Sequence, residues 1–189
     1  MGNYSTALSY LEKALAIWQQ SLSSNHPYLS TSYNNIGNMY YRMGDYPKAL
    51  SYYEKALAIW QQSFPPNHPD LALPYDNTGE VYNSMGDYSQ ALSYYEKAFA
   101  IKEQSLPSNH PDFAMSYNNI GEVYNSMGAY PKALSYYEKA LEIRQQSLPF
   151  NHPDLAASYN NIDEVHRIIS NYLKALSSHE KALEIQQQF

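Results

Sequence analysis

The chain has 189 residues and a formal net charge of −6, with 12 Lys and Arg against 18 Asp and Glu. No basic run occurs, which argues against nucleic acid or an anionic membrane as the partner, since both are bound through clustered Lys and Arg. Cysteine is absent, no apolar stretch approaches the ~20 residues that span a bilayer and no signal peptide opens the chain, so we expect no thiol chemistry, no membrane partner and a cytoplasmic location.

A 42-residue repeat organises the chain. The tripeptide Asn-His-Pro recurs at this spacing, beginning at Asn25, Asn67, Asn109 and Asn151. A fixed period of this length is typical of stacked supersecondary units that share one core. We therefore predict a single repeat array over residues 1–189, with these parts: a lone second helix at 1–24, repeat 1 at 25–66, repeat 2 at 67–108, repeat 3 at 109–150 and repeat 4 at 151–189.

The opening segment, 1–24, contains only the second half of a repeat. Its apolar residues follow a helical spacing from Tyr4 to Ala14, and no first helix precedes them. Met1-Gly2 fits the N-myristoylation motif. The same dipeptide recurs one period later at Met43-Gly44, which favours the interpretation that Met1-Gly2 belongs to a repeat cut in its middle over a lipidation signal. Because neither end has a polar capping repeat, we expect either a fragment of a longer array or ends that self-associate.

Each full repeat is predicted to be a helical hairpin. In repeat 1, Leu29, Tyr33, Ile36 and Tyr40 mark one face of a first helix. A break at Gly44-Asp45 precedes a second helix, which begins near Tyr46 and ends at about Ser63, before Pro65-Pro66. The Asn-His pair, at Asn67 and His68 for example, is expected to cap the first helix of the next repeat.

The predicted first helix of each of repeats 1, 2 and 3 has a glycine in its middle, at Gly37, Gly79 and Gly121. Glycine costs about 1 kcal/mol against alanine at such a position. Its recurrence predicts a close approach between helices that leaves no room for a side chain. Most of the 21 tyrosines occupy the packing positions around it and are expected to fill the core.

Two places depart from the repeat. Pro74 falls inside the first helix of repeat 2, so we predict that this helix bends or starts late. Repeat 4 has lost the shared pattern, with Asp163 in place of the close-packing glycine, His166 in place of a helical tyrosine, Ser170 in place of the loop glycine and Ser178-His179 in place of Tyr-Tyr. We expect this terminal repeat to be the least rigid.

The pattern resembles a known family. Tyr33-x2-Ile36-Gly37-x2-Tyr40, followed by Ala49, Tyr53 and Ala56, is similar to the tetratricopeptide signature W-x2-L-G-x2-Y with its later alanines. The 42-residue period, with His-Pro-Asp before the first helix, resembles the repeats of kinesin light chains. The resemblance covers essentially the whole chain and implies an all-α fold, a right-handed superhelical solenoid of antiparallel helical hairpins.

No constellation in the sequence indicates catalysis. His26, His68, His110 and His152 recur once per repeat, at sites ~10 Å or more apart given helix spacings of ~8–10 Å, so they cannot share a metal ion. His166 and His179 could meet near Asp163 and Glu164, but we favour a chance polar substitution over a metal site. No phosphate loop, nucleophile motif or paired carboxylates stand out, and we predict no enzyme activity, no metal and no cofactor.

The remaining candidate site is a groove lined by the first helices. On the helical wheel, polar residues of the first helices cluster opposite the apolar face that packs in the core. Asn amides suit the binding of an extended peptide, because they both donate and accept hydrogen bonds. The alternative is that these residues are ordinary polar surface residues without a binding role. The candidate groove residues are Asn34, Asn35, Asn38, Tyr41, Asp76, Asn77, Glu80, Asn83, Asn118, Asn119, Glu122, Asn125, Asn160, Asn161, Glu164 and Arg167.

The charge of this face sets the expected partner. The resemblance implies that kinesin light chain grooves take acidic peptides with the help of basic residues. Here the face carries more carboxylates than cations, which repels an acidic ligand. We therefore predict a non-catalytic adaptor that binds a neutral or basic peptide segment of a protein partner. The alternative is a structural spacer or self-associating segment of a larger protein, and the identity of the partner stays open.

Overall fold

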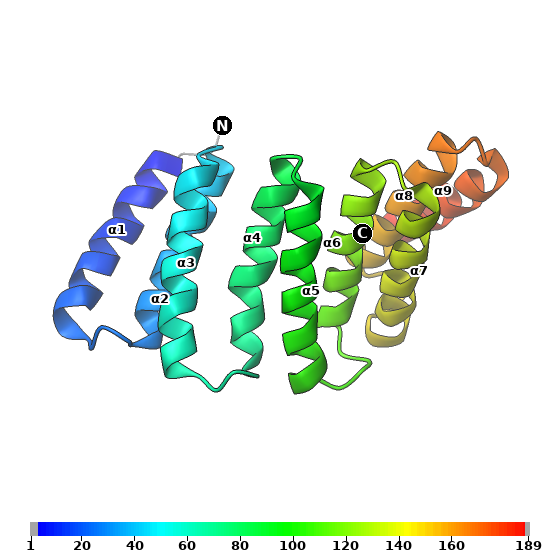
Figure 1. Cartoon of the computed structure of the whole chain (residues 1–189). Helices are drawn as coiled ribbons and strands as arrows, with labels where there is room; N and C mark the ends of the chain where they lie inside the picture. Colours follow the sequence, from blue (N-terminus) through cyan, green and yellow to red (C-terminus); the bar gives the residue numbers. More distant parts are fainter. Residues whose placement is uncertain (1–3, 188–189) are drawn as a thin grey trace. The chain divides into compact units, whose positions relative to one another are not determined.

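The helices follow the predicted hairpins. The computed structural model describes residues 4–187, and within this range it contains nine α-helices, one short 3₁₀ helix and no strand (Figure 1). The prediction of an all-α repeat fold is confirmed. Met1-Gly2, the candidate lipidation motif, lies outside the described residues. The helices are α1 (Tyr4–Ser21), α2 (Pro27–Arg42), α3 (Tyr46–Ser63), η1 (Pro69–Leu71), α4 (Ala72–Ser84), α5 (Tyr88–Ser105), α6 (Asp112–Ser126), α7 (Tyr130–Ser147), α8 (Pro153–Ile168) and α9 (Tyr172–Gln186).

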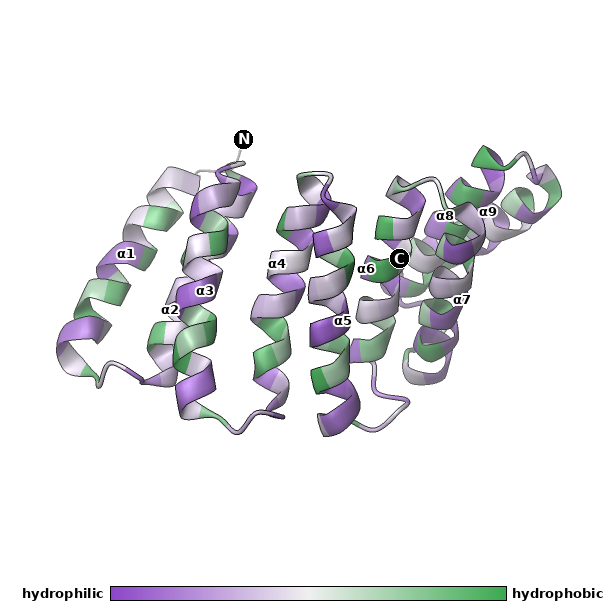
Figure 2. Ribbon diagram, viewed as in Figure 1, coloured by the Kyte–Doolittle hydropathy of each residue, from purple (hydrophilic) through white to green (hydrophobic). Residues whose placement is uncertain are grey.

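The chain divides into two compact units, Met1–Ser105 and Leu106–Phe189, here called the N-terminal and the C-terminal unit. The N-terminal unit contains α1 and the hairpins α2/α3 and α4/α5, and the C-terminal unit contains the hairpins α6/α7 and α8/α9. Within each unit, the second helix of one hairpin packs on the first helix of the next, as α3 does on α4 and α7 on α8. Hydrophobic and hydrophilic residues alternate along the helices, as expected where only one side is buried (Figure 2).

Histidine caps the start of the first helices, as predicted. The Nδ1 atoms of His26, His68, His110 and His152 each accept a hydrogen bond from the backbone N–H two residues further on, over 3.1 to 3.3 Å. Each bond satisfies a backbone donor that a helix start leaves without an intrahelical partner. The once-per-repeat histidine is therefore explained by helix capping.

The first helix of repeat 2 starts late, also as predicted. Pro27 begins α2, whereas the equivalent Pro69 begins the 3₁₀ turn η1, and α4 begins only at Ala72. Pro74 then falls in the first turn of α4. A missing N–H costs little there, because the first four N–H groups of a helix have no intrahelical partner.

The turn between the two helices of a hairpin needs a left-handed residue. Gly44, Gly86 and Gly128 supply it with φ angles of 78°, 78° and 72°. In repeat 4 the same position is Ser170, with φ 59°. Ser170 keeps the turn, since the N–H of the next residue, Asn171, still donates to the carbonyl of His166 over 2.8 Å.

The mid-helix glycines lie directly under tyrosine rings. A Cβ atom built on Gly37 would stand 2.5 Å from Cε1 of Tyr53, and the equivalent distance from Gly79 to Tyr95 is 2.8 Å. Gly121 lies under Tyr137 in the same way. The predicted close approach is therefore confirmed, and the ring of the second helix is the group that makes it.

Candidate functional site

The sixteen candidate groove residues do not share one environment. Two of them, Asn34 and Asp76, are buried, so they belong to the interior of the hairpins and not to an exposed face. The half-buried members are Asn38, Tyr41, Asn77, Asn83, Asn118, Asn119, Asn125 and Asn161. The exposed members are Asn35, Glu80, Glu122, Asn160, Glu164 and Arg167.

Some of the asparagines bond to one another. In the N-terminal unit, Nδ2 of Asn77 on α4 donates to Oδ1 of Asn34 on α2 over 2.8 Å. In the C-terminal unit, Asn161 on α8 donates to Asn118 on α6 over the same distance. These bonds join the first helices of consecutive repeats. The amides of the four residues therefore hold the scaffold together, a role that the sequence analysis did not assign to them.

Asp76 has a buried cationic partner. Nζ of Lys102 lies 2.7 Å from Oδ2 of Asp76, and the two side chains are 5% and 7% exposed. Lys102 stands on α5 at the position that Trp60 fills in repeat 1. This pair was not predicted from the sequence, although a lysine in an otherwise apolar core position was the signal that could have revealed it.

Two tyrosines lie close to Glu80 in the N-terminal unit. The hydroxyl of Tyr53 donates to Oδ1 of Asn38 over 2.7 Å. Burial raises the pKa of Tyr53, and the nearby charge of Glu80 raises it further. Burial also raises the pKa of Tyr41, whose hydroxyl lies 3.0 Å from Oγ of Ser84, and Glu80 adds to that shift. The Glu80 carboxylate is therefore close enough to both phenol groups to raise the pKa of each.

The same arrangement recurs in the C-terminal unit. Burial raises the pKa of Tyr137, and the charges of Glu122 and Glu164 raise it further. Glu122 on α6 and Glu164 on α8 are both exposed. Both carboxylates, from consecutive first helices, are therefore close enough to Tyr137 to add to this shift of its pKa.

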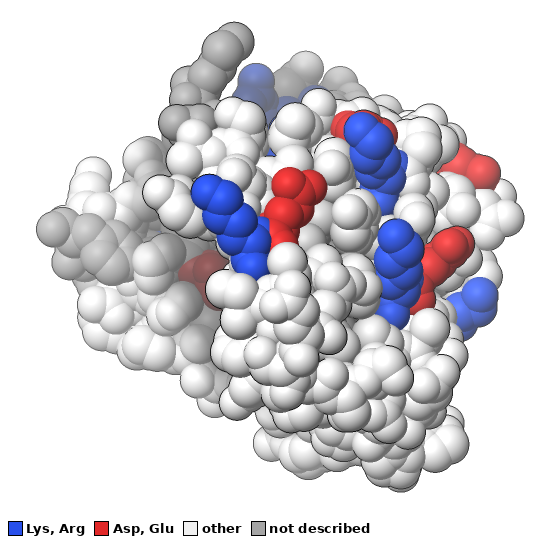
Figure 3. Space-filling model, turned by 90° about the vertical axis from the view of Figure 1, so that its left-hand side faces the viewer, with Lys and Arg blue, Asp and Glu red and all other residues white. Residues whose placement is uncertain are grey.

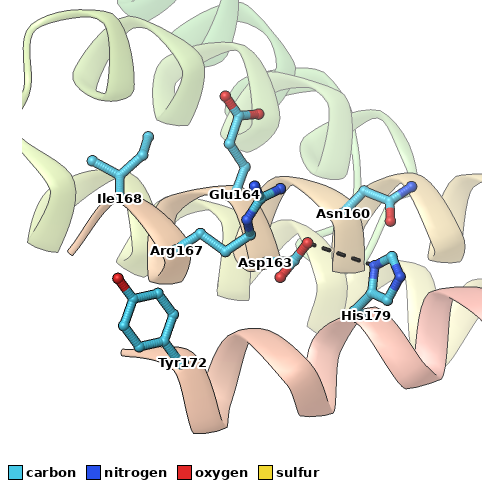
Figure 4. Close-up of a pocket in the computed structure, with 7 residues that line it drawn as sticks. All are labelled: Asn160, Asp163, Glu164, Arg167, Ile168, Tyr172 and His179. Carbon is cyan, nitrogen blue, oxygen red and sulfur yellow. Dashed lines mark ion pairs between the residues drawn. The ribbon is translucent and has the colours of Figure 1, made fainter. Parts of the chain in front are cut away.

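A polar pocket of about 670 Å³ opens in repeat 4 between α8 and α9 (Figure 4). On its wall, Nδ1 of His179 lies 3.7 Å from Oδ2 of Asp163. Three of its lining residues, Asn160, Glu164 and Arg167, are groove candidates from the sequence, whereas Ile168 and Tyr172 were not predicted, because nothing in the repeat pattern marks a cavity. The lining residues are Asn160, Asp163, Glu164, Arg167, Ile168, Tyr172 and His179.

The two histidines of repeat 4 lie in different surroundings. His179 faces Asp163, whereas His166 is buried and its Nδ1 has no hydrogen-bond partner. Burial lowers the pKa of His166, and the charge of Lys174 lowers it further. Across residues 4–187, no group of three or more His, Asp or Glu side chains is arranged to hold a metal ion.

None of the helices between residues 4 and 187 combines the length and the apolar character that crossing a bilayer requires.

Stacked helical hairpins, with glycine under tyrosine and a polar outer side on the first helices, define a helical repeat protein. The sequence model of the tetratricopeptide repeat matches residues 1–54, 28–104 and 112–188, so the chain belongs to the tetratricopeptide repeat family. Proteins of this family generally bind other proteins and are generally non-catalytic. None of the curated proteins matches the chain.

Solved structures show the same fold. A Podosopora anserina protein described as a kinesin light chain with nearly identical TPR-like repeats is 24% identical, with a TM-score of 0.75 over 99% of this chain and 89% of its own. BtubC (BKLC) from P. vanneervenii is 25% identical, with a TM-score of 0.83 over 99% of this chain and 74% of its own. The apo form of RapI is 22% identical, with a TM-score of 0.80 over 98% of this chain and 65% of its own.

Proposed function

We propose that the chain is a non-catalytic adaptor that binds a neutral or basic peptide segment of a protein partner on the exposed side of its first helices. The observation that carries this proposal is the set of exposed carboxylates on the first helices, with Glu80 in the N-terminal unit and Glu122 and Glu164 in the C-terminal unit. Glu122 and Glu164 stand at equivalent positions of consecutive first helices, one 42-residue period apart. Such a face attracts cationic segments and repels acidic ones.

The exposed amides provide the neutral part of this surface. Asn35 and Asn160 are exposed, and an asparagine amide can donate to and accept from a peptide backbone. Asn34 and Asp76 are left out of the proposed surface, because they are buried and already paired. The proposal therefore rests on fewer residues than the repeat pattern alone suggested.

A charge-reversal variant tests the proposal. Binding to an array of peptides that differ in net charge is measured for the wild type and for Glu80→Lys/Glu122→Lys/Glu164→Lys. The matched control is Glu54→Lys/Glu96→Lys/Glu138→Lys, which makes the same charge change at exposed positions of the second helices. We expect the wild type and the control to retain neutral and basic peptides, and the first variant to lose the basic ones.

Two results would overturn the proposal. One is a wild-type preference for acidic peptides, and the other is equal loss of binding in both variants. Circular dichroism of each variant confirms that a loss of binding does not reflect unfolding.

A second function, self-association, is favoured by apolar residues exposed on α1. Tyr10 and Ile17 are 69% and 60% exposed. Their equivalents one repeat later, Tyr52 and Ile59, pack against the core on α2. The side of the N-terminal unit on which α1 lies is largely uncharged, with scattered Lys, Arg, Asp and Glu (Figure 3).

A similar situation exists on α9. Leu176 and Leu183 are exposed, whereas their equivalents Leu134 and Leu141 on α7 pack against the core on α8. Light scattering over a range of concentrations tests whether a second copy covers these faces. We expect Ile17→Glu or Leu176→Glu to abolish a concentration-dependent mass if self-association is the function, and a constant monomer mass in the wild type would exclude it.

A further inference from the structure

Repeat 4 replaces a packing feature that the other three repeats share. In repeats 1 to 3 a tyrosine ring covers the mid-helix glycine, and Tyr137 over Gly121 is the nearest example. In repeat 4 the glycine is Asp163 and the tyrosine is His179. The two changes depend on each other, because a Cβ built on Gly121 would lie 2.8 Å from the tyrosine ring. An aspartate fits at this place only when the ring above it has gone.

The exchange coincides with the pocket. The side chain of His179 is 53% exposed, whereas Tyr137 is 4% exposed at the equivalent place. The volume of about 670 Å³ lies between the two helices that carry the exchanged residues (Figure 4). In repeat 3 the ring of Tyr137 is also covered by Ile162 and Val165 of the next hairpin, whereas within the described residues no further hairpin covers α9. Repeat 4 thus has an open pocket at the place where repeats 1 to 3 have a buried ring.

The acidic side of the pocket contains hydrogen-bond acceptors. The Asp163 side chain is only 12% exposed, and its ion-pair partner, Nδ1 of His179, lies at 3.7 Å, beyond hydrogen-bonding distance. No other ion pair of Asp163 is found among the described residues. The exposed carboxylate of Glu164 and the amide of Asn160 line the same pocket. This side can therefore accept several hydrogen bonds from a ligand.

The remaining lining residues add apolar surface and one positive charge. Ile168 and Tyr172 line the pocket next to the polar groups. Arg167 also lines it and is exposed, and it forms no ion pair within 4 Å in the described part of the chain. Its charge opposes a cationic ligand, but the two carboxylates outnumber it.

We propose that this pocket is the anchor subsite of the peptide-binding surface and that it takes the side chain of an arginine. The inference rests on the proposed function, since it names the residue that the bound peptide supplies. A guanidinium has five N–H donors and no acceptor, and its fork matches a carboxylate in two bonds. Its aliphatic stem suits Ile168, and its planar head can lie against the ring of Tyr172.

Other side chains fit less well. A lysine ammonium is a point charge without the fork geometry, so it gains less from Asp163 and Glu164. An acidic side chain would meet the same two carboxylates and be repelled. The pocket therefore favours arginine over lysine, and either of them over glutamate.

The test uses small probes and NMR titration of the full chain. N-acetylarginine amide is the ligand, N-acetylcitrulline amide is its uncharged analogue of nearly equal shape, and N-acetylglutamate amide is the acidic control. We expect saturable shifts of the pocket residues with the arginine probe and at least tenfold weaker binding of the other two. Equal binding of the citrulline probe, or tighter binding of the glutamate probe, would overturn the proposal.

Two variants locate the effect. Asp163→Gly/His179→Tyr restores the ring over glycine found in repeats 1 to 3 and fills the pocket, so we expect it to lose arginine binding. Asp163→Asn keeps the pocket open and removes only the charge, and we expect at least tenfold weaker binding. Wild-type affinity in either folded variant would exclude the site.

The outcomes separate the pocket from the proposed function. If basic peptides bind and are lost on Glu80→Lys/Glu122→Lys but not on Asp163→Asn, the adaptor function stands and the arginine subsite is wrong. If the arginine probe binds at Asp163 but no peptide binds the chain, the guanidinium site stands and the peptide-binding function is wrong.

Discussion

Ser170 has a backbone conformation that the other repeats reserve for glycine. Its φ is 59°, close to the 72° of Gly128 at the same position in repeat 3. A left-handed conformation costs an L-residue roughly 1–2 kcal/mol, and glycine avoids this at the expense of greater freedom in the unfolded chain. We therefore expect Ser170→Gly to raise the free energy of unfolding by about 1 kcal/mol.

Urea denaturation measures this change, and repeat 3 offers the reverse control. Gly128→Ser should lower the free energy of unfolding by a similar amount. An unchanged or lowered value for Ser170→Gly would mean that the serine hydroxyl compensates for the strain.

The buried pair of Lys102 and Asp76 makes each residue dependent on the other. Removing one member of a buried ion pair leaves an uncompensated charge and typically costs about 3–5 kcal/mol. We expect Lys102→Met to destabilise the chain by this amount in urea denaturation. The double variant Asp76→Leu/Lys102→Met should recover most of the loss, because both charges are then gone. A small effect of Lys102→Met alone would contradict a structural role for the pair.

His166 should make stability depend on pH. Burial and Lys174 lower its pKa below the ordinary value of 6.5, whereas Glu138 and Asp163 partly oppose this shift. The folded state then prefers the neutral imidazole, so the unfolded state binds more protons as the pH falls below 6.5. We expect the free energy of unfolding to decrease from pH 6.5 downwards until the folded-state pKa is passed.

The contribution of His166 is isolated by comparison with His166→Tyr, which restores the residue of repeats 1 to 3. Urea midpoints are measured for both proteins at pH 8 and at pH 5. The loss of stability at pH 5 should be smaller in the variant, and an equal loss in both proteins would show that other groups cause it.

At the scale of the helices, the contact between glycine and tyrosine sets the hairpin packing. Alanine has the better helix propensity by about 1 kcal/mol. A Cβ on Gly37 would nevertheless stand 2.5 Å from the ring of Tyr53, which is buried and bonded to Asn38. Overpacking of this kind typically costs 1–3 kcal/mol, so we expect Gly37→Ala to be neutral or to lower the melting temperature.

A second substitution separates the two contributions. In a Tyr53→Leu background the ring is gone, so alanine at position 37 should raise the melting temperature by its helix propensity. The same sign of effect in both backgrounds would contradict the packing argument.

The sequence predicted local features well and contacts between repeats poorly. Helix ends, the histidine caps and the role of Gly37 follow from residue type and spacing, and the structure confirms them. The bond between Asn34 and Asn77 and the pair of Asp76 with Lys102 depend on which side chains meet across helices. A helical wheel gives the direction of a side chain but not its neighbour, which is why buried and exposed positions were grouped together.

At the scale of the whole chain, stability in a repeat protein is approximately a sum of the intrinsic stability of each repeat and the contacts with its neighbours. Repeat 4 has polar residues at core positions, where Asp163, His166 and Ser178 are buried, and α9 exposes Leu173 and Leu176. Both features reduce the apolar burial that holds its helices. We therefore predict that the backbone amides of α8 and α9 exchange with deuterium faster than those of α3 and α5.

A variant that restores the pattern of repeats 1 to 3 tests the cause of this difference. Asp163→Gly/His166→Tyr/Ser178→Tyr/His179→Tyr should slow exchange in α8 and α9 by more than tenfold, because it returns buried aromatic rings to this hairpin. Exchange in α3 should stay unchanged, since α3 belongs to the other compact unit. Equal slowing in all helices would mean instead that the chain opens as a single cooperative unit, and that the polar residues of repeat 4 weaken the whole molecule.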